Sequence, residues 1–155
     1  MSLIEKYNNK LPGYHPILIR EGWQVAQLNY MEEQDITNIK KIDVHRWTDE
    51  AFWLQKGRAV LITADLQDDK PIFYAELMLP EIVYNIPKDV WHNIAMTPGS
   101  EVIIVEKSET HLDDFEFFDL NEQQYQEMKE IVLNVLNTKL NERVNGSLGK
   151  RLRKG

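Results

Sequence analysis

The chain has 155 residues, 43% of them hydrophobic and 28% charged, a composition typical of one globular domain rather than of a disordered chain. It contains no cysteine, which excludes disulfides and thiolate chemistry, and its formal net charge of −7 disfavours nucleic acid as a partner, because phosphate binding needs clustered Lys and Arg. No segment has the roughly 20 consecutive apolar residues of a membrane helix and no secretion signal is recognisable, so we expect a cytoplasmic protein without membrane contact.

Short β-strands are the predicted elements of the first two thirds of the chain. Each is rich in β-branched and aromatic residues and is bounded by turn signals, such as QDDKP at 67–71. The expected strands lie at 23–31, 39–45, 58–66, 72–80, 82–87, 90–96 and 101–108, with a further one close to 50–54. About eight short strands at this spacing predict an all-β sandwich or barrel rather than a parallel α/β sheet.

The last third changes to the period of an amphipathic helix. Asn121 is the predicted N-cap, and Gln124 can reach back to it as in a capping box. The apolar face consists of Tyr125, Met128, Val132, Val135 or Leu136, and Leu140. We expect this helix, within 119–144, to pack on the outside of a β-domain that takes residues 1–118, with a coiled-coil or dimer contact as the alternative. The basic end, 145–155, is expected to be a flexible, solvated tail.

Four polar residues are spaced so that they can converge inside the barrel. Asp43 and His45 are two residues apart in an expected strand, so their side chains share a face. A turn at 46–49 would return Glu50 to that face, and His92 begins a later strand. Two imidazoles and carboxylates suit a divalent ion with open positions for water or substrate. The alternative is that both histidines are half-buried residues satisfied by local hydrogen bonds.

The stretch from Asp43 to Gly57 resembles the first motif of the cupin superfamily. That motif runs Gly, five residues, His-x-His, three or four residues, Glu, six residues, Gly. His45, Glu50 and Gly57 keep this spacing, and Asp43 stands where the first histidine would be. The register that makes His45 the first histidine leaves only two residues before Glu50, so the Asp43 register is preferred.

The second cupin motif runs Gly, five residues, Pro-x-Gly, two residues, His, three residues, Asn. Pro87 and His92 fall at its intervals, whereas Glu81, Asp89 and Met96 replace the two glycines and the asparagine. The resemblance covers roughly residues 40 to 107. It implies a double-stranded β-helix, or jelly-roll, barrel, here with one C-terminal α-helix.

The resemblance also implies a ligand set and a function. His45, Glu50 and His92 would bind a divalent ion (Zn, Mn, Fe or Ni), with Asp43 as a fourth ligand or as the partner that orients His45. We expect a metal-dependent enzyme of carbohydrate metabolism that acts on a small polar ligand, a carbohydrate or sugar acid, by isomerase, epimerase or lyase chemistry. The alternatives are a non-haem Fe(II) oxygenase and a non-catalytic ligand-binding cupin. A homodimer is expected, because the family covers sheet edges by pairing across a two-fold axis.

Two further groups of residues flank the predicted site. The aromatic group is expected to be core or interface, or alternatively to stack on a ligand; it consists of Trp47, Phe52, Trp53, Tyr84 and Trp91. Trp91 is expected to point outward, beneath the helix or at a dimer contact. The polar group consists of Lys107, Glu109 and His111 and is expected to be a solvated loop, or alternatively a source of a proton donor. His15 is expected to be a turn residue.

Overall fold

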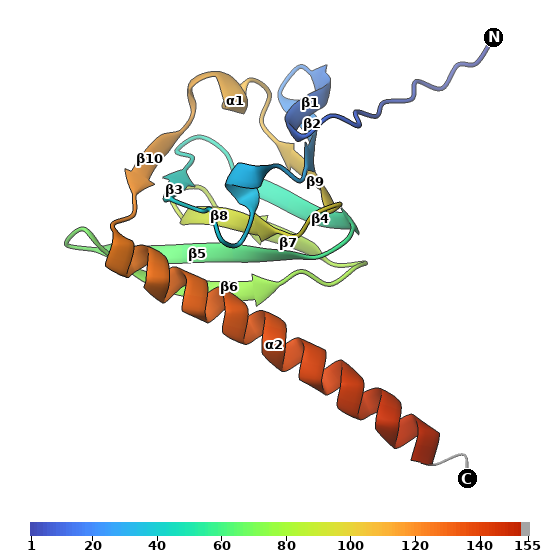
Figure 1. Ribbon diagram of the computed structural model, residues 1–155. Coiled ribbons are helices and arrows are strands. Elements are labelled where there is room, and N and C mark those ends of the chain that lie inside the picture. The colour runs from blue at the N-terminus through green and yellow to red at the C-terminus, as the bar shows by residue number, and fades with distance from the viewer. Residues whose placement is uncertain (153–155) are drawn as a thin grey trace.

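The computed structural model describes the backbone of residues 1–152 and the side chains of residues 1–138. Within this part the chain forms two five-stranded sheets, a long C-terminal helix and two short helical segments (Figure 1). The strands are β1 (Gly13–Arg20), β2 (Trp23–Asn29), β3 (Lys41–Val44), β4 (Glu50–Lys56), β5 (Ala59–Gln67), β6 (Lys70–Leu77), β7 (Val83–Ile86), β8 (Trp91–Met96), β9 (Glu101–Glu106) and β10 (Glu116–Asp119). The helical segments are η1 (Glu32–Gln34), α1 (Thr110–Asp113) and α2 (Glu122–Leu152).

The strand order is that of a jelly-roll. One sheet has the order β1-β2-β9-β4-β7 and the other β10-β3-β8-β5-β6, and the paired strands in both are antiparallel. From β2 to β9 the chain crosses to the opposite sheet at every connection except the β5–β6 hairpin. Two interlocked Greek keys of this kind make a jelly-roll. The predicted all-β barrel with one C-terminal helix is therefore confirmed.

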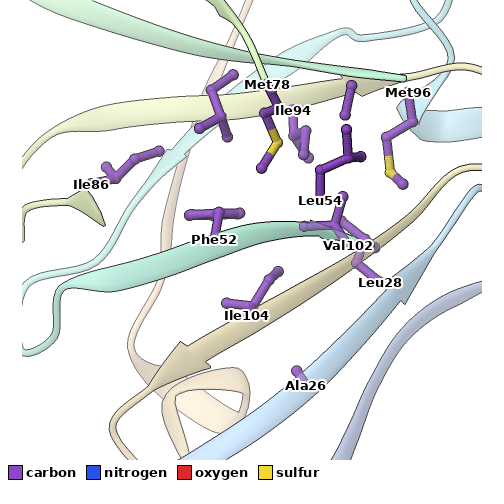
Figure 2. Close-up of a cluster of buried hydrophobic side chains, with 12 residues drawn as sticks. Ala26, Leu28, Phe52, Leu54, Met78, Ile86, Ile94, Met96, Val102 and Ile104 are labelled. Carbon is purple, nitrogen blue, oxygen red and sulfur yellow. The ribbon is translucent and has the colours of Figure 1, made fainter. Parts of the chain in front are cut away.

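Two hydrophobic cores hold the fold together, one inside the barrel and one beneath α2. The inner core fills the space between the sheets and includes Phe52, Ile94 and Ile104 (Figure 2). The outer core packs alternate side chains of β5, such as Val60 and Ile62, against the helix. Because β5 is covered on both faces, its sequence is a continuous apolar run rather than an alternating one.

Helix α2 packs along β5 and β6 through the face that the sequence predicts (Figure 1). Tyr125, Met128, Val132 and Leu136 are all buried in the outer core, whereas the side chain of Leu140 lies outside the described residues. Trp91 packs beside this core, with its ring 6.2 Å from that of Phe118. The outward position expected for Trp91 is therefore correct.

The capping box at the start of α2 is present. The backbone N–H of Gln124 donates to Asn121 Oδ1 at 2.9 Å, and the N–H of Asn121 donates to Gln124 Oε1 at 3.0 Å. We expect Asn121→Ala to lower the free energy of unfolding by about 1 kcal/mol, because an N-terminal N–H loses its acceptor. Urea denaturation measures this loss. The control Asn134→Ala, an exposed position inside the helix, should cost nothing; equal effects of the two substitutions would contradict the capping role.

The structure differs from the sequence prediction at the edges of the sheets and at the end of the helix. Strand β1 was not predicted because Pro16 reads as a breaker, yet this edge strand accommodates it next to a bulge. Strand β10 and α1 were also missed. Helix α2 does not end at residue 144 but continues to Leu152, so most of the expected tail is helical, and residues 153–155 lie outside the described part. None of the described helices has an apolar stretch of the length that crossing a membrane requires.

Candidate metal centre

The four residues singled out in the sequence meet at one end of the barrel interior. Asp43 lies in β3 directly opposite His92 in β8, His45 follows β3, and Glu50 is the first residue of β4. The turn that joins β3 to β4 returns Glu50 to the face of Asp43 and His45, as the spacing predicts. His45, Glu50 and His92 are buried, and all four line a cavity of about 300 Å³.

Their polar atoms are within contact distance of one another. Glu50 Oε2 lies 2.6 Å from His92 Nε2 and 3.2 Å from His45 Nε2. His45 Nε2 is also 3.5 Å from Asp43 Oδ2, and one donor atom each from Asp43, His45 and His92 lie within 4.8 Å of one another. Ligands about 2.0 to 2.2 Å from a common ion have separations of this order.

The outer nitrogens of both imidazole rings are fixed by backbone carbonyl groups. His92 Nδ1 donates to Val90 O at 2.9 Å, and His45 Nδ1 donates to Asp114 O. Because a carbonyl can only accept, each Nδ1 carries a proton, and a neutral ring then presents a bare Nε2. Both Nε2 atoms face the carboxylate of Glu50, which also only accepts. A proton or a cation must therefore lie between each Nε2 and the Glu50 carboxylate. The residues fit a divalent ion as well as they fit two imidazolium rings.

The charge arrangement shifts the titration of every group in the cluster. Burial disfavours the His45 imidazolium, but the hydrogen bond and charge of Glu50 outweigh this and raise the pKa of His45 to about 9. Burial opposes ionisation of Glu50 too, yet the two imidazoles hold its pKa well below the usual range. The pKa of His92 is raised against burial by Glu50 and Asp43, and burial raises the pKa of Asp43.

These shifts predict that the metal-free protein loses stability as pH rises. A group whose pKa is higher in the folded than in the unfolded state binds more protons when folded, so the free energy of unfolding falls as pH rises between the two values. For His45 this interval runs from 6.5 to about 9, and for Glu106, whose pKa burial raises, from 4.5 to about 7.

We therefore expect the melting temperature of chelator-treated protein to fall steadily from about pH 5 to about pH 9. A saturating divalent ion should flatten this dependence, because the ion takes the place of the protons. Calorimetry over the pH range measures both curves. A metal-free melting temperature that stays constant or rises across this interval would contradict the charge arrangement.

Sequence reasoning missed a second polar group in the same cavity. Glu106 at the end of β9 is buried, with 5% of its surface exposed, and its Oε1 accepts hydrogen bonds from the Tyr14 hydroxyl and, at 3.0 Å, from Gln24 Nε2. The signal was available, because Val102, Ile104 and Glu106 alternate toward the interior. The sequence prediction includes Glu106 in the expected strand 101–108 but assigns it no role.

Of the three polar residues expected just after this strand, only His111 lines the cavity. Its Nδ1 lies 3.2 Å from Gln24 Nε2, so the amide donates to the ring. Lys107 and Glu109 are exposed and are not among the lining residues. The expectation that His15 is a turn residue is wrong: it lies in β1 opposite Gln27, and its ring Nε2 bonds to the carbonyl groups of Leu11 and Pro12.

A single carboxylate, Asp114, ties the segment over the cavity to the ligand-bearing turn. Its oxygens accept the backbone N–H groups of Arg46 at 2.8 Å and Trp47 at 3.1 Å, while its carbonyl accepts His45 Nδ1. The same segment, from α1 to β10, contributes four lining residues to the cavity, namely Thr110, His111, Phe115 and Phe117. The position of His45 is therefore coupled to this covering segment.

Much of the remaining cavity lining is apolar. It includes Leu28, Met31, Phe52, Ile94 and Ile104. No Lys or Arg is among the lining residues in the described part of the chain. Phe52 is the one member of the predicted aromatic group that lines the cavity; Trp47 and Trp53 are exposed, and Tyr84 and Trp91 pack against the cores. The aromatics thus do not form a stacking platform.

The sequence matches no family model and no curated protein. Solved structures that resemble the chain include a cupin-2 domain protein from Shewanella frigidimarina, with 19% identity over 64% of this chain and 84% of that one and a TM-score of 0.45. KdgF from Halomonas has 12% identity over 66% and 86%, with a TM-score of 0.41. A variant of oxalate decarboxylase from Bacillus subtilis has 15% identity over 72% and 30%, with a TM-score of 0.48.

Similarity at this level carries no inference about chemistry, and the fold is assigned from the chain itself. The order of β2 to β9 is that of a jelly-roll. His45 and Glu50 flank the turn between β3 and β4, His92 lies in β8, and all three face the barrel interior. The chain therefore has the jelly-roll barrel that the resemblance to the cupin superfamily implies.

Proposed function

We propose that the chain is a metal-dependent enzyme that acts on a small, uncharged, oxygen-bearing metabolite. The divalent ion, Zn, Mn, Fe or Ni, is held by His45, Glu50 and His92, with Asp43 as a fourth ligand or as the partner of His45. The observation that carries this proposal is the pair of imidazoles whose Nδ1 atoms are fixed by carbonyl groups while their Nε2 atoms converge on Glu50. When bound, the ion polarises a carbonyl or hydroxyl oxygen of the ligand.

The cavity favours a neutral carbohydrate over a sugar acid. A buried carboxylate on the ligand needs a cationic partner, but no Lys or Arg lines the described cavity, and the carboxylates of Glu50 and Asp43 already balance the charge of a divalent ion. Gln34 lines the cavity, and its Oε1 has no hydrogen-bond partner among the described residues, so its side-chain amide is free to turn toward a ligand hydroxyl. Of the two ligands expected from the sequence, the neutral carbohydrate is therefore favoured over the sugar acid.

His111 is positioned to exchange a hydrogen bond or a proton with the ligand. The Gln24 amide nitrogen can only donate, so His111 Nδ1 accepts and the proton of the neutral ring lies on Nε2. The ring lines the cavity beside Thr110. An isomerase, epimerase or lyase step needs such a group within reach of the reacting carbon or oxygen.

An Fe(II)-dependent oxygenase is the second candidate, supported by the apolar wall of the cavity. Two histidines and one carboxylate leave adjacent positions for dioxygen and substrate. The apolar side chains of Leu28, Phe52 and Ile104 would hold a less polar substrate than a sugar. Oxygen consumption in the presence of Fe(II) and substrate separates this activity from isomerisation.

The experiment that tests the proposed function uses protein loaded with Mn²⁺ or Co²⁺ and a matched pair of ligands. A neutral aldose should perturb the spectrum of the bound ion and be converted, as followed by NMR, whereas the corresponding aldonic acid should bind more weakly. Binding of the aldose that is identical with and without metal would favour the non-catalytic ligand-binding alternative. The cytoplasmic location and the homodimer stay predictions of the same proposal.

A further inference from the structure

Glu106 lies next to the predicted ligands although the cupin motifs include no residue of β9. It is the last residue of the strand and faces the barrel interior. One carboxylate oxygen of Glu106 and the donor atoms of His45 and Glu50 lie within 4.8 Å of one another. His45 belongs to two such groups, because the donor atoms of Asp43, His45 and His92 also lie within 4.8 Å of one another.

Glu106 is not directly paired with a cation among the described side chains. It forms no ion pair with a Lys, Arg or His in that part of the chain, and its neighbour Glu50 carries the same charge. A carboxylate oxygen of Glu106 and one of Glu50 lie within 4.8 Å of each other, a separation that two ligands of one ion can have. A divalent ion beside Glu50 would serve both groups.

The hydrogen bonds of Glu106 orient its carboxylate in the way that metal-ligating carboxylates are oriented. The Tyr14 hydroxyl and Gln24 Nε2 both donate to the same oxygen, Oε1. Gln24 is fully buried and is itself fixed, because its Oε1 accepts the backbone N–H of Glu109 at 2.9 Å. No donor among the described residues is hydrogen-bonded to Oε2 of Glu106, so this oxygen is available to a cation.

We propose that Glu106 is a further ligand of the ion, which gives the centre an oxygen-rich donor set of two imidazoles and up to three carboxylates. This inference rests on the proposed metal site. Carboxylate-rich sets suit harder ions in five- or six-coordination, so Mn²⁺ or Fe²⁺ is favoured over Zn²⁺. Because three carboxylates exceed the charge of one divalent ion, the loaded centre keeps a net negative charge and disfavours anionic ligands.

The test is a titration of the chelator-treated full chain with Mn²⁺ and with Co²⁺. Glu106→Gln should weaken Mn²⁺ binding at least about tenfold and change the Co²⁺ visible absorption, because a ligand is lost. The matched control is Glu101→Gln on the same strand, whose carboxylate pairs with Lys10 at 3.6 Å and does not line the cavity. The control should bind both ions as the wild type does.

Wild-type affinity together with a wild-type Co²⁺ spectrum in Glu106→Gln would overturn the inference and leave the proposed function standing. Absence of metal binding in the wild-type chain would overturn both. Should Glu106→Gln fail to fold, Glu106→Asp keeps the charge but withdraws the carboxylate. It should show the same weakening and spectral change if Glu106 is a ligand, and neither if it is not.

Discussion

Replacing His92 with alanine is expected to weaken binding of a divalent ion by at least about 100-fold. His92 Nε2 lies 2.6 Å from Glu50 Oε2, and its Nδ1 is committed to the Val90 carbonyl, so the lost nitrogen points straight into the centre. Isothermal titration of chelator-treated protein measures the affinity. The rise in melting temperature that the ion causes in the wild type should also be lost, because an ion that binds only the folded state raises the melting temperature.

The matched control for this variant is His15→Ala. His15 is bonded to the carbonyl groups of Leu11 and Pro12 and does not line the cavity, so the control should bind the ion as the wild type does. Metal affinity that is equal in His92→Ala and wild type would show that His92 is a buried histidine satisfied by Glu50. A large loss of metal-free stability in His92→Ala, with no metal bound by the wild type, would lead to the same conclusion.

Gly57→Ala is expected to produce the largest loss of stability among single substitutions outside the centre. Gly57 has φ +82°, and an added Cβ would lie 2.4 Å from Ser100 Oγ and 2.7 Å from Ser100 Cα. The clash with the Ser100 backbone cannot be relieved by rotating a side chain, and Ser100 is also bonded to the backbone of Arg58 through its hydroxyl. Backbone strain and overpacking together should cost about 3 kcal/mol or more.

Gly22→Ala separates strain from crowding. Gly22 has φ +85°, but nothing lies within 4 Å of the position that an added methyl group would take, so the cost should be only about 1 kcal/mol. Urea denaturation of both variants gives the comparison. Equal destabilisation would mean that the clash with Ser100 relaxes without cost, and would leave the positive φ as the only physical reason for a glycine at position 57.

The middle strands could be predicted from the sequence because their side chains pack against buried surfaces on two sides. Strand β5 sends Ala59 and Leu61 into the barrel and Val60 and Ile62 toward α2, which leaves an unmistakable apolar run. An edge strand has no such requirement. In β10, Phe117 is 51% exposed, and the strand pairs with β3 alone, so its sequence carries no clear burial pattern.

The centre was predictable where ligands follow strand periodicity and not where they depend on tertiary packing. Asp43 and His45 share a face because they are two residues apart, and the turn before Glu50 restores that face. Asp114 is 69 residues from the ring that its carbonyl fixes, and no local pattern links the two. Glu106 was missed for a different reason, because it ends its strand beside polar residues that were expected to form a solvated loop.

The most direct test of the metal centre is a crystal structure of protein loaded with Mn²⁺, with anomalous diffraction used to locate the ion. We predict about one ion per chain, within about 2.0 to 2.3 Å of His45 Nε2, His92 Nε2 and a Glu50 oxygen. A structure in which saturating Mn²⁺ leaves no anomalous peak in the cavity, with both Nε2 atoms still bonded to Glu50, would contradict the account.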